Sequence, residues 1–376
     1  MRTVNGIYTS AEIFTTNNEQ TAIDDYALAQ LQMICDNEAS KGSAIRVMPD
    51  IHPGKTGPIG LTMTVGSRIL PALVGIDIGC GMTLAALGTA RIEFQKLDTI
   101  IRERIPSGFS IRSKAHRFAE DFDFTSLCCY KHIRKEKALL SLGTLGGGNH
   151  FIEVDKDENG TLYVILHSGS RHLGKEVAEY YLGEGQNFLT AQGIRVPYEL
   201  TWLEGTLMAD YLHDLEVIRR FASLNREIML EELIKGMKWK VTDSYSCPHN
   251  YVDTSSDVPL LRKGAISAKQ DEKVIIPINM KDGVILGTGR GNAAWNCSAP
   301  HGAGRIGKRA DIRQQFTVSA YKTAMKGIYS TCINKDTLDE APFAYRTADD
   351  IAEIISDTVT INHIICPVYN FKAGSR

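Results

Sequence analysis

The 376-residue sequence lacks the features that assign many chains to a class at first sight. Its net charge is only −2, with 43% hydrophobic and 23% charged residues, so disorder, a coiled coil and a globally basic nucleic-acid binder are not expected. The most apolar stretch, ILPALVGIDIG, is interrupted by Asp77 and is too short to cross a bilayer. The first residues, MRTVNGIYTSAEIF, show no basic segment followed by an apolar one, as a secretory signal would. We therefore expect a cytoplasmic protein with no membrane partner.

The sequence also lacks any CxxC pair. Scattered cysteines without an export signal are expected to remain reduced, and reduced thiols can bind metal. The eight cysteines are Cys35, Cys80, Cys128, Cys129, Cys247, Cys297, Cys332 and Cys366.

Hydrophobic periodicity predicts helices over residues 19–39, 207–239 and 348–359. Strands are predicted in AIRVM, LTMTV, ALVGIDIG, FIEV, LYVILH, KVIIPINM and GVILGTG, with GCGM at 79–82 as a turn. Helices and strands do not alternate in regular βαβ units, and no repeat or linker divides the chain. We therefore expect an α+β fold, a mixed β-sheet core flanked by helices, in a single domain over residues 1–376.

Three glycine-rich stretches resemble nucleotide-binding loops but fail where their mechanism needs a particular residue. GSRHLGKE ends in Glu176, where a P-loop needs Ser or Thr for magnesium, and PDIHPGKT has Pro49 in place of the first glycine. GTGRGN, from Gly287, lacks the last small residue of the dinucleotide fingerprint. Neither a P-loop NTPase nor a Rossmann dehydrogenase is expected.

Five histidines lie in or beside loops rich in Gly, Pro, Ser or Asn, where strands often present ligands. A lone histidine of this kind is usually a structural hydrogen-bonder, but five of them accompany GIDIGCGM, in which Asp77 and Cys80 lie three residues apart. Thiolate, imidazole and carboxylate together suit zinc, manganese, iron or cobalt. If one ion binds here, or two ions share the Cys80 sulfur, glycines 79 and 81 would leave room for the metal. The histidines are His52, His150, His167, His249 and His301.

His301 stands apart because HGAGR surrounds it with glycines whose N–H groups can approach phosphate oxygens. Arg305 follows as a candidate guanidinium clamp. A histidine so placed can act as a nucleophile toward phosphorus, while a metal ligand or an oriented hydrogen-bonder fits the spacing equally well.

Seven segments together resemble the RtcB family of RNA ligases, in that family's order and over most of the chain. They are MPDIHPGKTGPIG, PALVGIDIGCGM, LGTLGGGNHFIEV, LHSGSR, HN, RKGA and HGAGR. The length is similar to the compact branch of the family, often found beside a release-factor homologue.

The resemblance implies GTP-dependent joining of an RNA 3′-phosphate or 2′,3′-cyclic phosphate end to a 5′-hydroxyl end, with two Mn²⁺ ions. By motif, Asp77, Cys80 and His150 would hold one ion, and Cys80, His167 and His249 the other. His301 would become guanylylated, and Asp50 would orient its ring. RNA repair is the implied role, with cleaved ribosomal or transfer RNA as candidate substrates; the oligomeric state is left open.

Nucleotide contacts are implied for a further set of residues. They are Asn149, Glu153, Asn250, Thr288, Gly302, Ala303, Gly304, Arg305 and Lys372. The family usually has a Gly-Ser-Met-Gly loop upstream of the nucleophile, and GTGRGN is the segment expected to replace it. Thr288 would then supply the hydroxyl, and Arg290 would add a charge near the nucleotide.

Two alternatives remain open. A manganese-dependent phosphoesterase acting on RNA cyclic phosphates needs only the metal ligands, and an inactive paralogue would only bind RNA ends. For RNA contact, basic residues over 102–137 interleave with Phe109, Phe118 and Tyr130, although a solvated helix face explains them equally well.

Overall fold

The computed structural model describes residues 1–15, 23–306 and 309–373. Two larger sheets dominate it. The first has the order β1 (Arg2–Asn5), β2 (Ser10–Ile13), β3 (Ile45–His52), β4 (Ile59–Thr64), β12 (Leu260–Lys263) and β11 (Asn250–Asp253). The second has the order β10 (Asp243–Pro248), β6 (Gly81–Gly88), β8 (Leu162–Ser168), β7 (Phe151–Lys156), β17 (Val359–Lys372), β15 (Gly283–Gly289) and β14 (Lys273–Asn279). Two-stranded sheets pair β13 (Ala265–Ser267) with β16 (Ser298–Pro300) and β5 (Arg68–Ile69) with β9 (Leu203–Glu204).

Helices cover these sheets, and among the described elements only β2, β3 and the helix between them form a βαβ unit. Among the described strand pairs only β2 and β3 run parallel, so the predicted α+β class is confirmed. The α-helices are α1 (Asp25–Cys35), α2 (Pro71–Val74), α3 (Phe94–Arg104), α4 (Lys135–Ser141), α5 (Arg171–Ala191), α6 (Gly205–Met237), α7 (Arg309–Gln315), α8 (Val318–Ala324) and α9 (Ala348–Ile355). Short 3-10 turns are η2 (Glu38–Ser40), η3 (Arg117–Ala119), η4 (Phe124–Ser126), η5 (Tyr130–His132), η6 (Tyr198–Leu200), η7 (Ala293–Trp295), η8 (Lys335–Glu340) and η9 (Pro342–Ala344).

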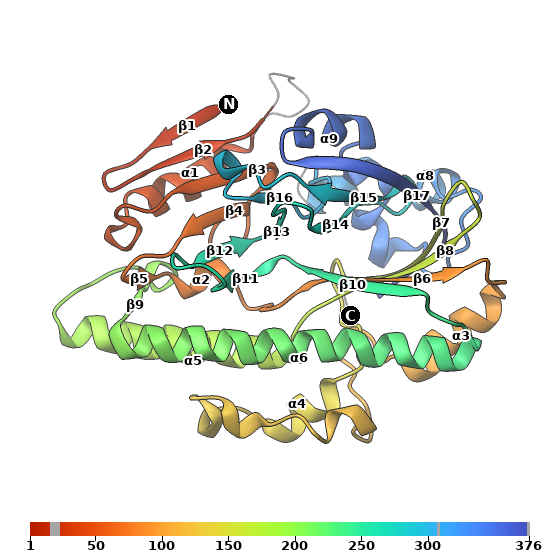
Figure 1. Cartoon of the computed structure of the whole chain (residues 1–376), viewed down its shortest axis with the longest axis horizontal. Helices are drawn as coiled ribbons and strands as arrows, with labels where there is room; N and C mark the ends of the chain where they lie inside the picture. The colour runs from red at the N-terminus through yellow and green to blue at the C-terminus, as the bar shows by residue number, and fades with distance from the viewer. Residues whose placement is uncertain (16–22, 307–308, 374–376) are drawn as a thin grey trace.

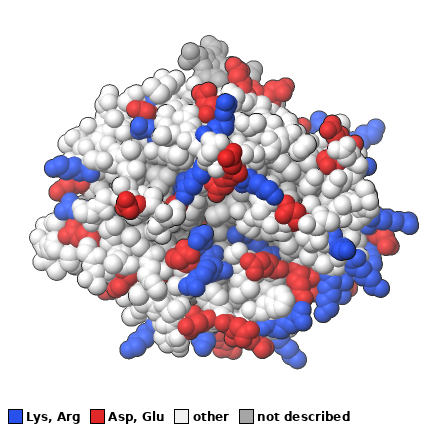
Figure 2. All heavy atoms as spheres, in the orientation of Figure 1, with Lys and Arg blue, Asp and Glu red and all other residues white. Residues whose placement is uncertain are grey.

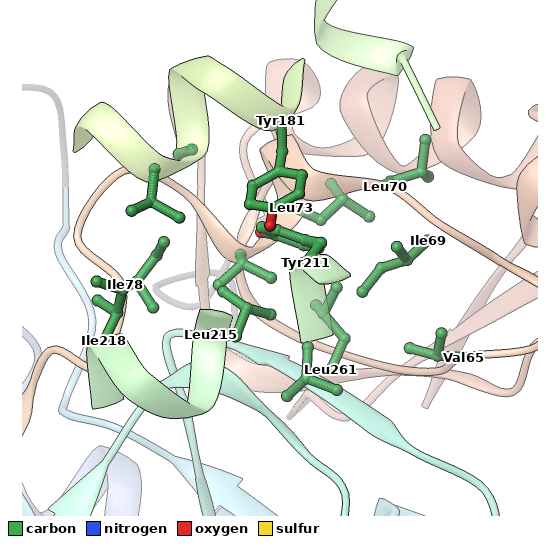
Figure 3. Packing of buried hydrophobic residues seen from close by; sticks show 14 of the residues in the cluster. Val65, Ile69, Leu70, Leu73, Ile78, Tyr181, Tyr211, Leu215, Ile218 and Leu261 are labelled. Atoms are coloured by element: carbon green, nitrogen blue, oxygen red, sulfur yellow. The ribbon is translucent and has the colours of Figure 1, made fainter. Parts of the chain in front are cut away.

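The long helices α5 and α6 lie side by side beneath the sheets, and the segment that carries α4 lies below them (Figure 1). A continuous apolar core joins α5 and α6 to α2 and β12 (Figure 3). Tyr181 of α5 and Tyr211 of α6 are almost completely buried there, with ring centroids 5.0 Å apart. No helix in the described ranges is both long and apolar enough to span a membrane.

Most predicted elements are present, but one strand is wrong. ALVGIDIG begins as the short helix α2, since Pro71 occupies its first turn, and then bends at Gly75, whose φ is +86°. The strand β6 begins only at Gly81, inside the GCGM segment that was expected to be a turn. The helices predicted over 207–239 and 348–359 correspond to α6 and α9, and that over 19–39 to α1, its residues 19–22 lying outside the described part of the chain.

Candidate active site

Five side chains from four segments of the chain converge beside β6 and β8. Cys80 Sγ lies 3.5 Å from His150 Nε2 and 3.3 Å from His167 Nε2. His167 Nε2 lies 3.3 Å from His249 Nε2, and His150 Nε2 lies 3.0 Å from Asp77 Oδ2. Strand pairing explains the convergence, because Gly81 is opposite Ser168, next to His167, and His167 in turn faces Phe151, next to His150. All five predicted metal-ligating residues therefore meet; we call them the Cys80 cluster.

Hydrogen bonds outside the cluster fix two of its imidazole rings. His150 Nδ1 lies 2.8 Å from the Leu145 carbonyl, and His167 Nδ1 lies 3.1 Å from the Asn149 carbonyl. When Nδ1–H donates to a carbonyl, Nε2 keeps its lone pair, and in both rings Nε2 faces the Cys80 sulfur. His249 Nδ1 is buried and has no hydrogen-bond partner among the described residues.

The electrostatics of the cluster fit a bound cation. Burial and the adjacent Asp77 carboxylate raise the pKa of Cys80 well above its usual value. Burial and neighbouring histidines lower the pKa values of His167 and His249 well below the ordinary range. Burial opposes ionisation of Asp77, but His150, the Cys80 thiol and Arg171 together outweigh it and lower the pKa of Asp77 to about 2. Neutral imidazoles beside a thiol and a carboxylate are a donor set for a divalent transition metal, which would stabilise the thiolate.

The glycines around Cys80 make room for the protein chain and not for a metal, which corrects the expectation from the sequence. A methyl group on Gly79 would meet Ala222 and the backbone of Arg219 on α6, and one on Gly81 would meet Pro248. Glycines that do border ligands are Gly169, where a methyl group would lie 2.1 Å from Asp77 Oδ1, and Gly146, where one would lie 2.8 Å from His150 Nδ1.

Helix α6 supports the cluster from below. Arg226 is 2% exposed and donates to Thr83 Oγ1 and to the carbonyls of Gly79 and Ser168. Because Gly79 precedes Cys80 and Ser168 follows His167, one buried guanidinium fixes the backbone next to two members of the cluster.

His301 follows β16, and Asp50 belongs to β3, in the first of the two larger sheets. His301 Nδ1 lies 2.7 Å from Asp50 Oδ2, and the Asp50 side chain is fully buried. The His301 ring centroid lies 4.9 Å from that of His249 and 6.4 Å from that of His52. The ring is thus oriented through Nδ1, and the lone pair is left on Nε2, next to the Cys80 cluster.

A cavity of about 1320 Å³ opens onto these residues. His167, His249 and His301 line it, and several of the predicted contact residues do so too: Asn149, Glu153, Gly302, Ala303, Gly304, Arg305 and Lys372. The face of the molecule drawn in Figure 2 mixes basic and acidic side chains.

Two predicted contact residues are absent from the cavity lining. Asn250 donates to the Asp77 carbonyl at 3.3 Å and accepts from the Gly264 N–H, so it holds the loop that carries Asp77. Thr288 lies on β15, where it accepts a hydrogen bond from Asn362.

The segment that faces the cavity near His301 is the end of β14 and not GTGRGN. Pro277, Ile278, Asn279 and Met280 line the cavity. Arg290, expected to add a charge near the nucleotide, instead donates to the Ser356 carbonyl and does not line the cavity.

Arg305 and Lys372 are held by a shared acidic partner. Arg305 pairs with Glu340 at 3.1 Å and donates to the Tyr345 hydroxyl at 2.8 Å, while Lys372 pairs with the other Glu340 oxygen at 2.5 Å. Arg305 is therefore no free phosphate clamp in this structure, because much of its hydrogen-bonding capacity is used within the protein.

The five arginines over 102–137 are paired with acidic residues. Arg112 pairs with Glu232 at 2.7 Å, and Arg134 pairs with Glu176 at 2.5 Å. Arg102, Arg104 and Arg117 also have acidic partners. Phe109 is 90% exposed, but Tyr130 packs against the apolar core. The arginines favour the solvated-face interpretation, and RNA contact by this segment stays a prediction.

Sequence reasoning missed several lining residues. They are Phe151, Pro277, Ile278, Asn279, Met280, Tyr345, Arg346 and Asn370. His52, which the sequence did single out, also lines the cavity and is not part of the Cys80 cluster. The sequence signal that marks His52 is its place in PDIH. Asn370 reaches the cavity because β17 pairs with β7, which aligns it with Glu153.

Comparison with known proteins agrees with this arrangement. A family model described as "tRNA-splicing ligase RtcB" matches residues 38–129 and 120–373. The chain is similar to the RNA-splicing ligase RtcB of Escherichia coli K12, with 31% identity over 367 residues, covering 86% of this chain and 89% of that protein. It is also similar to the tRNA-splicing ligase RtcB of Aeropyrum pernix, with 25% identity over 403 residues and coverage of 82% and 83%.

Proposed function

Because the chain belongs to the RtcB family, we propose that it is an RNA ligase. The finer proposal is that it joins a 3′-phosphate or 2′,3′-cyclic phosphate end to a 5′-hydroxyl end through a guanylylated His301. The observation that carries it is the Asp50–His301 pair, 2.7 Å apart, on the wall of a cavity that His167 and His249 also line.

Asp50 prepares the nucleophile. Its carboxylate accepts from His301 Nδ1, so Nε2 presents a lone pair to the α-phosphorus of GTP. A P–N bond forms as the bond from the α-phosphorus to the pyrophosphate oxygen breaks, and pyrophosphate leaves. The positive charge that develops on the ring is stabilised by Asp50, which is fully buried.

The Cys80 cluster has the donors that two Mn²⁺ ions would need: Asp77, Cys80 and His150 would hold one, and Cys80, His167 and His249 would hold the other. Such ions supply Lewis acidity that offsets phosphate charge. On the cavity wall, Asn149 and Glu153 are placed to contact the nucleotide, and Lys372 lies beside them.

The guanylyl group then activates the RNA. An oxygen of the RNA 3′-phosphate attacks the phosphorus on His301, the P–N bond breaks, and the 3′ end carries a phosphoanhydride to GMP. Attack of the 5′-hydroxyl oxygen on the RNA phosphorus then forms the phosphodiester and releases GMP, with loss of the hydroxyl proton. A cyclic phosphate end must first be opened by water to the 3′-phosphate.

The test is covalent labelling. Wild-type protein incubated with α-labelled GTP and Mn²⁺ should carry a stable adduct of GMP mass, and His301→Ala should carry none. His52→Ala is the matched control, because its ring also lines the cavity but does not contact Asp50 through its carboxylate. A metal-loaded wild-type protein that never labels, yet opens 2′,3′-cyclic ends without GTP, would establish the phosphoesterase alternative instead.

A further inference from the structure

A second group of thiol, imidazole and carboxylate lies far from the cavity lining, between the segment before α4 and helix α6. Ligand atoms of Cys128, His213 and Asp214 all lie within 4.8 Å of one another. Asp210 adds a further carboxylate that acts on the Cys128 thiol, along with that of Asp214. Residues 210, 213 and 214 share one face of α6, since i, i+3 and i+4 positions are neighbours on a helix. We call this group the Cys128 cluster.

Its side chains are oriented by bonds to the surrounding protein. Asp214 Oδ1 accepts from the Cys128 N–H at 2.8 Å, and Oδ2 accepts from the Cys129 N–H at 3.1 Å and the Tyr181 hydroxyl at 2.7 Å. With one hydrogen bond only, Oδ1 keeps a lone pair for a cation. His213 Nε2 lies 2.9 Å from the Ser126 carbonyl, so the other ring nitrogen carries the lone pair. Carboxylates and imidazoles that bind metals are typically held by such outer hydrogen bonds.

The charge of this group is unbalanced. Neither Asp210 nor Asp214 forms an ion pair with any residue that the structure describes. A divalent cation would offset the charge of these two carboxylates.

We propose that the Cys128 cluster binds a zinc-like divalent cation through Cys128 Sγ, a ring nitrogen of His213 and carboxylate oxygens of Asp214 and Asp210. One thiolate, one imidazole and carboxylate oxygens are ligands that zinc accepts in tetrahedral sites, and a given site of this kind binds Zn²⁺ more tightly than Mn²⁺. The bound ion ties the segment before α4 to α6, which carries Asn225 and Arg226. From the segment before α4, the chain continues through α4 to Gly143 and Thr144, whose N–H groups donate to Asn225. It then enters the loop that precedes His150.

The test follows the thiol itself. Cys128 is exposed, and so is Cys366 on β17, which serves as the internal control. Metal-free protein is treated with an alkylating reagent with and without Zn²⁺, and both cysteines are followed by peptide mass spectrometry. At a free Zn²⁺ concentration ten times the dissociation constant, Cys128 alkylation should slow about tenfold, while Cys366 is unaffected. Mn²⁺ at the same concentration should protect Cys128 much less, because a given site binds Mn²⁺ more weakly than Zn²⁺.

His213→Gln removes one ligand from an exposed position and should abolish most of the protection. His132→Gln is the matched control, because His132 lies in the same segment, stacks on Tyr180 and is no member of the cluster. Alkylation of Cys128 at equal rates with and without Zn²⁺, or full protection in His213→Gln, would overturn the proposal. Neither measurement depends on RNA joining, so the result is independent of the function proposed above.

Discussion

The Cys80 and Cys128 clusters use the same three kinds of donor in opposite surroundings. Cys80, His150, His167 and His249 are buried, and two of them line the cavity. Cys128 and His213 are exposed, and none of their cluster lines that cavity. Catalytic metal sites keep a position open to substrate, whereas structural sites are filled by protein ligands. Donor chemistry alone therefore does not separate a reactive centre from a structural one; the access of substrate does.

The largest expected effect is the difference in activity between replacing the Cys80 thiol and replacing the Cys128 thiol. Cys80→Ser removes the sulfur that lies within 3.5 Å of two histidines, so GTP-dependent labelling and RNA joining should fall below detection. Cys128→Ser should leave both within about twofold of wild type, as surface changes away from a site usually do. Circular dichroism shows whether each variant is folded. Equal loss in the two folded variants would abolish the distinction between the clusters.

A large but incomplete effect is expected at Asp50. Asp50→Asn keeps the shape of the side chain but removes the charge opposite His301 Nδ1 and permits the wrong tautomer. The rate of guanylylation should fall by roughly 10³- to 10⁴-fold, as for other carboxylates that orient a catalytic histidine. Single-turnover labelling measures this rate, and Asp24→Asn at the cavity rim is the control. An unchanged rate would show that Asp50 does not prepare the nucleophile.

The smallest expected effect is on the pH dependence of stability. It arises from Glu153 on the cavity wall and from Asp155, which lies on the same face of β7. Burial raises the pKa of Glu153 to about 7, and burial together with Glu153 raises the pKa of Asp155 well above its ordinary value. Unfolded carboxyl groups lose their protons near pH 4, so the folded state holds more protons from there to about pH 7. The free energy of unfolding should therefore decrease as pH rises through this window.

In Asp155→Asn, the free energy of unfolding should fall less steeply with pH than in the wild type. The slope should change by up to about 1.4 kcal/mol per pH unit, the value for one proton. Urea unfolding at several pH values measures the slope. Glu158→Gln, at an exposed position beyond the same strand, should keep the wild-type slope. A steep slope retained in Asp155→Asn would mean that this buried pair does not control the pH dependence.

The Cys80 cluster could be predicted from the sequence because its members lie in short motifs with unusual neighbours. Asp77 and Cys80 share one segment, and His150 and His167 each sit at a strand end beside glycines. The cause assigned to glycines 79 and 81 was wrong, because the approach of α6 and β10 depends on tertiary structure. Likewise, GTGRGN resembled the expected loop in composition, but it lies beside the start of β14, whereas the other end of that strand lines the cavity.

The Cys128 cluster could not be predicted from local pattern. Cys128 and His213 are 85 residues apart in the sequence, and they meet beside Asp214 only in the folded chain. Neither lies in a recognisable motif. Helix α5 was also missed, because glycines at 174, 183 and 185 weaken its helical pattern. Two of these glycines allow close packing: a methyl group on Gly174 would meet Ser170, and one on Gly185 would meet Leu203.

The strand register of the larger sheet limits how the chain can change length during evolution. Lys372 is aligned with Phe151, Asn370 with Glu153, and Phe151 with His167. Because side chains alternate between faces, losing one residue within β7, β8 or β17 would turn every later side chain of that strand to the opposite face. Insertions and deletions that preserve activity should therefore accumulate in the connections, and the strands should keep a constant residue count even where their amino acids differ.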